Sequence, residues 1–80
     1  MAKQRISDVD FIEALNGLDA TGYDRMSSSG QETLDAFFDK AEKGIKQRDL
    51  DKMVDDIQWE YDRMGSDGQH YFNILKNAKI

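Results

Sequence analysis

Residues 49–64 read DLDKMVDDIQWEYDRM, and this stretch decides the fold. Its apolar residues recur at steps of three and four, which is the spacing of one face of an α-helix. Trp59, the only tryptophan in the chain, falls on the opposite side of that helix. The stretch therefore predicts an amphipathic helix, the longest and most central of the fold, with a large aromatic residue on its charged side. Its apolar face consists of Leu50, Met53, Val54, Ile57, Tyr61 and Met64.

The composition predicts one small helical domain that spans residues 1–80. Hydrophobic residues make up 39% of the chain, which is enough for a folded core. The absence of proline, together with 34% charged residues, favours helices. There is no cysteine, and no apolar run is long enough for a signal peptide or a membrane span. We therefore expect a soluble cytoplasmic protein without contact to a membrane.

Capping residues and glycines delimit three further helices. Serine or aspartate precedes each predicted helix, where its side chain can accept a hydrogen bond from a free backbone N–H group. Glycine follows the first three, where it permits the left-handed conformation that ends a helix. The architecture is therefore an all-α domain of four helices joined by short connections. The expected bounds are Ser7–Gly17, Ser29–Lys43, Asp49–Met64, and a fourth helix from Ser66 or Asp67 almost to the C-terminus.

The motif Tyr-Asp-Arg-Met occurs twice, at residues 23–26 and 61–64, an offset of 38 residues. Seven of the nine positions of residues 23–31 agree with residues 61–69. This indicates an internal repeat, about 7–44 and 46–80, of two duplicated helix–corner–helix halves. Each half is too small to bury its own apolar face, so we expect the halves to pack on each other. In the first half, Gly17 and Gly22 are expected to shorten the leading helix.

The net charge of −5 disfavours direct nucleic-acid binding, which requires a basic stripe along the phosphate backbone. It suits a basic partner protein, although a surface that is merely solvated would look the same. A helix-turn-helix regulator is the DNA-binding alternative. Only the fourth helix, with Asn73, Lys76, Asn77 and Lys79, is basic and polar enough to serve as its recognition helix.

Trp59 and the aspartates around it form the candidate partner-binding surface. Tryptophan is enriched at binding hot spots, and a rim of carboxylates would suit a partner that is apolar in the middle and basic at its edge. Burial under the first helix is the alternative for Trp59. The residues of this candidate surface are Asp51, Asp55, Asp56, Trp59 and Asp62.

The repeated corner is a second candidate site. Each copy offers an arginine, a tyrosine and the N-terminus of the following helix, which are the ingredients of an anion site. A symmetric anion such as a nucleotide would then bind at the interface of a homodimer. The purely structural alternative has Ser28 and Gln31 capping the second helix. The candidate anion-binding residues are Tyr23, Arg25, Tyr61 and Arg63.

No motif indicates catalysis or a cofactor. His70 is the only histidine, and no nucleophile or carboxylate is tied to it by a recognisable spacing. Two carboxylate pairs are spaced four residues apart, Asp51 with Asp55 and Asp56 with Glu60. We interpret them as a solvated acidic face, because they lack the alternating ligands and central glycine of a calcium loop. We therefore expect no enzyme, no catalytic residue, no metal and no cofactor.

In size and charge the chain resembles the short acidic proteins that phages and mobile elements use as stoichiometric inhibitors. Certain anti-CRISPR proteins of this kind present carboxylates where a nucleic acid presents phosphates. The resemblance rests on general character rather than on a motif. It implies a non-enzymatic inhibitor or adaptor that acts on a basic, nucleic-acid-handling host protein.

Overall fold

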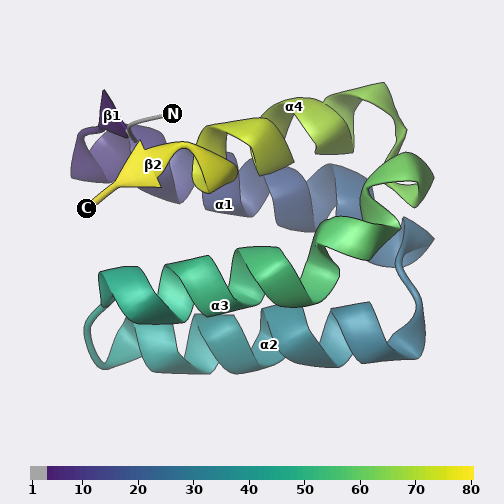
Figure 1. Cartoon of the computed structure of the whole chain (residues 1–80), viewed down its shortest axis with the longest axis horizontal. Helices are drawn as coiled ribbons and strands as arrows, with labels where there is room; N and C mark the ends of the chain where they lie inside the picture. The colour runs from purple at the N-terminus through teal and green to yellow at the C-terminus, as the bar shows by residue number, and fades with distance from the viewer. Residues whose placement is uncertain (1–3) are drawn as a thin grey trace.

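Four α-helices, two 3₁₀-helices and two short strands make up residues 4–80, the part of the chain that the computed structural model describes (Figure 1). The domain is all-α, as predicted. Its elements in chain order are β1 (Gln4–Arg5), α1 (Asp8–Gly22), η1 (Tyr23–Arg25), α2 (Ser28–Glu42), α3 (Gln47–Ile57), η2 (Gln58–Arg63), α4 (Gly65–Lys76) and β2 (Ala78–Lys79).

The helices form two pairs, α1 with α4 and α2 with α3, which lie one above the other in Figure 1. The leading helix of each predicted half therefore packs on the second helix of the other half. One apolar core joins the two pairs. The predicted stripe of α3 supplies much of it, since burying each large aliphatic side chain contributes about 1.5–3 kcal/mol. Fully buried core residues include Leu18, Leu34, Leu50, Ile57 and Leu75.

The predicted end of the first helix at Gly17 is wrong. α1 continues to Gly22, and Gly17 lies within it without a positive φ angle. The reason is a contact from the far end of the chain: the ring of Tyr71 lies against the Cα of Gly17. A Cβ atom on residue 17 would come within 2.6 Å of three carbons of that ring. Gly17 thus allows α1 and α4 to approach closely instead of ending a helix.

The third helix is shorter than predicted. α3 ends at Ile57, and residues 58–63 form the 3₁₀-helix η2, so α1 and α2 are the longest helices. The break turns Glu60 toward α2, where its Oε1 atom accepts a hydrogen bond from the backbone N–H of Ser27. A continuous α-helix would have kept Glu60 in register with Asp56 on the acidic face. The prediction that Asp56 and Glu60 lie together on that face is therefore wrong.

The helix ends follow the predictions in part. Ser7 caps α1 by accepting a hydrogen bond from the Asp10 N–H at 3.1 Å. Gly44 follows α2 with a φ angle of 115°, as expected of a helix-ending glycine. α2 is capped by Ser27 rather than by Ser28 or Ser29, and α3 begins at Gln47, before Asp49. α4 begins at Gly65, and among residues 4–80 no side chain caps it.

The two strands join the ends of the described chain. β1 and β2 pair in parallel, with Gln4 opposite Ala78. The Gln47 side chain adds a second link, since its Oε1 atom accepts a hydrogen bond from the N–H of Ile80 at 2.9 Å. This ladder was not predicted from the sequence, because each strand has only two residues. Within residues 4–80, no helix is both long and apolar enough to cross a membrane.

Candidate protein-binding surface

The two corners with the sequence Tyr-Asp-Arg-Met share a hydrogen bond from a glutamine side chain. Gln31 Nε2 donates to the carbonyl of Tyr23 at 2.9 Å, and Gln69 Nε2 donates to the carbonyl of Tyr61 at 3.0 Å. Each tyrosine hydroxyl also bonds to the residue 12 positions later, Asp35 in one corner and Asn73 in the other. Gln31 therefore supports the corner itself instead of completing a cap with Ser28.

The two corners differ at the position that precedes the motif. The second has Glu60 where the first, 38 residues earlier, has Gly22. Glu60 is fully buried, and its carboxylate lies against Gly30 at the first turn of α2. A carboxylate at this place interacts favourably with the N-terminal end of the helix dipole. Its Oε2 atom has no hydrogen-bond partner among the described residues.

Gly22 occupies the equivalent place in the other helix pair, where it contacts Gly68. A Cβ atom on residue 68 would lie 3.4 Å from the Cα of Gly22. Two glycine backbones meet here, whereas a glutamate side chain separates η2 from α2. The role of Glu60 was not predicted, although the difference between Gly22 and Glu60 at equivalent positions of the repeat was a signal for it.

Trp59 projects from η2 and is 60% exposed, so the structure excludes its burial under the first helix. The 3₁₀ geometry points Glu60 inward and leaves its neighbour Trp59 outside. The guanidinium of Arg63 lies 6.0 Å from the centre of the Trp59 ring, at the outer limit of a cation–π contact. A groove of about 500 Å³ runs beside Trp59 and is lined also by Gln58, Tyr61, Asp62, Phe72, Asn73 and Lys76.

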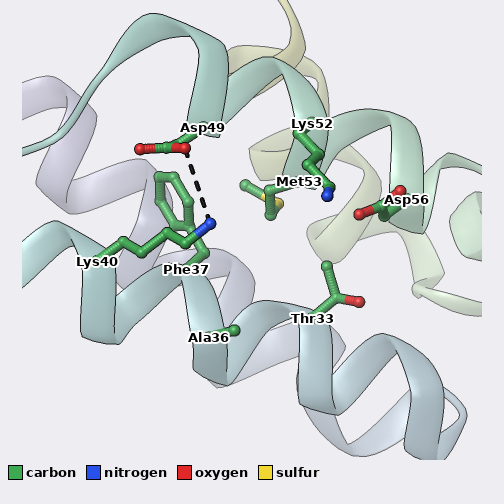
Figure 2. Close-up of a pocket in the computed structure, with 8 residues that line it drawn as sticks. All are labelled: Thr33, Ala36, Phe37, Lys40, Asp49, Lys52, Met53 and Asp56. Atoms are coloured by element: carbon green, nitrogen blue, oxygen red, sulfur yellow. Dashed lines mark ion pairs between the residues drawn. The ribbon is translucent and has the colours of Figure 1, made fainter.

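The predicted aspartates do not all gather around Trp59. Asp62 lines the same groove as Trp59. Asp55 is exposed on α3, and Asp56 lies at the edge of a different groove, between α2 and α3 (Figure 2). Asp51 is half-buried and accepts a hydrogen bond from Gln47, the residue that also holds the C-terminal segment. The acidic surface is therefore spread along α3 and η2.

The candidate anion-binding residues take different roles in the two corners. The hydroxyl of Tyr23 donates to Asp35 at 2.9 Å, and the hydroxyl of Tyr61 accepts a hydrogen bond from Asn73 at 3.0 Å. Arg25 lies over Gly65 at the start of α4, whereas Arg63 lies beside the Trp59 ring. Only Arg25 therefore meets a helix N-terminus.

The hydrogen bond to Asp35 raises the pKa of Tyr23 above its ordinary value of 10.0, with smaller contributions from desolvation and neighbouring carboxylates. The bond favours the neutral phenol because only that form can donate to the carboxylate. Tyr23 thus remains protonated and bonded at neutral pH.

The histidine and the remaining carboxylates of residues 4–80 give no candidate metal site. His70 is exposed on α4 and stacks edge-on against Tyr71. Across residues 4–80, no three histidine, aspartate or glutamate side chains come together in a way that would hold a metal ion.

Fold and surface together define a small all-α domain with an exposed tryptophan on η2. Comparisons with protein-family models, with known proteins and with solved structures give no match.

Proposed function

We propose that the protein is a non-enzymatic interaction module that binds a basic, nucleic-acid-handling protein through Trp59 and the aspartates of α3 and η2. The exposure of Trp59 is the observation that carries this proposal. A tryptophan that is 60% exposed leaves most of its ring available to a partner. Large aromatic anchors of this kind contribute most of the binding free energy at many interfaces.

The negative charge of the chain as a whole favours a basic partner. The chain carries a net charge of −5, and residues 49–64 contain six acids and two bases. A basic partner would be attracted over a distance set by the ionic strength, and its association would slow as salt is added. We infer a stoichiometric inhibitor or adaptor of the type that phages and mobile elements use, similar in action to anti-CRISPR proteins that present carboxylates in place of phosphates.

Affinity capture from the source cell with wild type and Trp59→Ala side by side tests this function. Val9→Ala is the matched control, because Val9 is 72% exposed on α1, away from η2. We expect wild type and Val9→Ala to retain a basic protein that Trp59→Ala loses. Asp55→Asn and Asp62→Asn should each weaken capture by a few-fold, and added salt should weaken it further. Equal capture by wild type, Val9→Ala and Trp59→Ala would contradict the proposal.

A second candidate function is the binding of a small anion such as a nucleotide at Arg25. A Cβ atom on Gly65 would lie 3.2 Å from a terminal nitrogen of Arg25, so the guanidinium sits at the N-terminus of α4. The carboxylates of Asp24 and Asp67 line the same groove and oppose an anion. Thermal unfolding with added nucleotide tests it, since a bound ligand raises the melting temperature. The rise in melting temperature on adding nucleotide should be absent in Arg25→Ala and should persist in Arg63→Ala.

A further inference from the structure

The outer face of α1 carries two large aliphatic side chains that are exposed to solvent. Val9 is 72% exposed and Ile12 is 53% exposed, and we call them the aliphatic pair. Asn16 and Ala20, which are also exposed, continue this face toward the C-terminal end of the helix. The steps between the four positions are three, four and four residues, the spacing at which one helix contacts another. This face therefore has the spacing of a helix–helix contact, although no helix of residues 4–80 covers it.

The charge of α1 is entirely negative. Among the four α-helices of residues 4–80, only α1 has no basic residue. It has four carboxylates, all exposed, and none of them forms an ion pair within the described part of the chain. At about 100° per residue they fall on both sides of the aliphatic pair. Glu13 and Asp10 lie on one side, and Asp8 and Asp19 lie on the other.

The stability of the helix alone does not account for this face. Valine and isoleucine are weaker helix formers than leucine or alanine, and exposed positions give them few core contacts in return. Asp8 and Asp10 lie in the first turn of α1, where the helix dipole favours an acid. Asp19 lies in the last turn, where the dipole opposes an acid and no basic residue compensates. A contact with another molecule would explain both the aliphatic pair and Asp19.

We propose that the outer face of α1 docks a basic amphipathic helix of a partner protein. The apolar stripe of that helix covers the aliphatic pair, and its lysine or arginine residues lie opposite the carboxylates on either side. A second copy of this chain is disfavoured, because pairing α1 with itself would bring the four carboxylates of each copy together. An anionic lipid surface would be repelled for the same reason.

This surface is separate from the one proposed to bind through Trp59. Trp59 lies on η2 beside its own groove, and no residue of α1 lines that groove. Docking at α1 therefore goes beyond the proposed function and does not depend on it. Two separate surfaces would let one chain hold two basic proteins, which is the action of an adaptor rather than of an inhibitor. Only this last step rests on the proposed function.

The test is a titration of the full chain with a synthetic peptide, followed by NMR at the methyl groups of Val9 and Ile12. The peptide is about 18 residues of lysine, leucine and alanine, with leucine at every third or fourth position to give one apolar stripe. One control peptide has the same composition with the leucines spread around the helix. Another has glutamate in place of lysine. We expect saturable shifts with the striped basic peptide, about tenfold lower affinity for the scrambled one, and no binding of the glutamate peptide.

Variants of the full chain distinguish docking at α1 from a general attraction to an acidic protein. Ile12→Lys should lower the affinity for the striped basic peptide by about tenfold or more, because it removes an aliphatic contact and adds a like charge. Val9→Lys serves in its place if that variant fails to fold. Glu13→Gln should lower the affinity a few-fold, whereas Asp55→Asn removes the same charge from an exposed site on α3 and should leave the affinity unchanged.

Equal losses of affinity in Glu13→Gln and Asp55→Asn would overturn the proposal, because the peptide would then respond to net charge alone. Equal affinity for the striped and scrambled basic peptides would overturn it as well. Trp59→Ala should bind the striped peptide like wild type. Partner capture lost in Trp59→Ala, with no peptide binding at α1, would remove the docking face and leave the proposed function intact. Peptide binding at α1, with partner capture insensitive to Trp59→Ala, would do the reverse.

Discussion

The carboxylate of Glu60 lies directly against the backbone of Gly30, so that η2 is fixed to the first turn of α2. A Cβ atom on residue 30 would overlap that carboxylate, and even the Cδ atom of Glu60 would be only 2.7 Å away. Residue 30 must therefore be a glycine, because any side chain would overlap the carboxylate. Glu60 accepts a hydrogen bond from the N–H of Ser27, which lies 33 residues earlier in the chain. This contact lies in the 3₁₀ segment that follows α3, where the neighbouring Trp59 is at the surface.

Gly30→Ala should destabilise the fold by about 1–3 kcal/mol, as expected of an overpacked site. Glu60→Ala should cost about the same, because it leaves the Ser27 N–H without its acceptor. In the double variant the new methyl group occupies the space of the lost carboxylate, so the two losses should not add. Urea unfolding of the four proteins measures this. Ser29→Ala, exposed in the same turn, is the control, and additive losses would show that the two residues do not interact.

Gly17→Ala should also destabilise the fold, although alanine is the better helix former by about 1 kcal/mol. The methyl group would overlap the ring of Tyr71, and the overlap should outweigh the gain in helix propensity. The sign should reverse in a Tyr71→Ala background, where only the propensity remains. Melting temperatures of both pairs of proteins check this. Stabilisation by Gly17→Ala in the wild-type background would mean that Tyr71 does not lie on this glycine.

Gly17 and Gly30 show which features of the fold could not be predicted from the sequence. The apolar stripe of α3 was predicted correctly because it depends only on local periodicity, and Leu50, Met53, Val54 and Ile57 are all buried. Gly17 looks locally like a helix end, but it lies inside α1, where its missing side chain makes room for the ring of Tyr71, far along the chain. Tertiary contacts override local signals in such cases.

The sequence left two places open for Trp59, at the surface or buried under the first helix. The helical wheel placed Trp59 opposite the apolar stripe, and its exposure agrees with that position. It did not predict the inward turn of Glu60, which depends on a partner 33 residues away. The groove between α2 and α3 was not predicted either, because it depends on how the two helices pack in three dimensions. The common origin of the two halves remains a prediction from the repeated sequence.

Trp59→Ala should change the free energy of unfolding by less than about 1 kcal/mol, since an exposed side chain contributes little and its contact with Arg63 is weak. The fluorescence of the folded protein should be that of a solvated indole and accessible to iodide. Arg63→Gln removes the cationic contact alone and should have a smaller effect on unfolding. A loss above about 2 kcal/mol, of the size seen for core truncations, would mean that Trp59 stabilises the fold rather than serving a partner.

Tyr23 should titrate at a higher pH in the folded protein than in the unfolded chain, because Asp35 raises its pKa above 10.0. Folding therefore gains stability from this residue at all pH values below the unfolded pKa, and loses it as the pH rises through the folded pKa. Asp35→Asn reproduces the pairing of Tyr61 with Asn73 in the second corner, where the amide donates to the phenol oxygen. It should lower the pKa of Tyr23, because an amide that donates to the phenol oxygen also stabilises the phenolate. NMR titration of the Tyr23 ring carbon beside the hydroxyl measures both values, and an unchanged pKa in Asp35→Asn would show that the hydrogen bond to Asp35 is absent in solution.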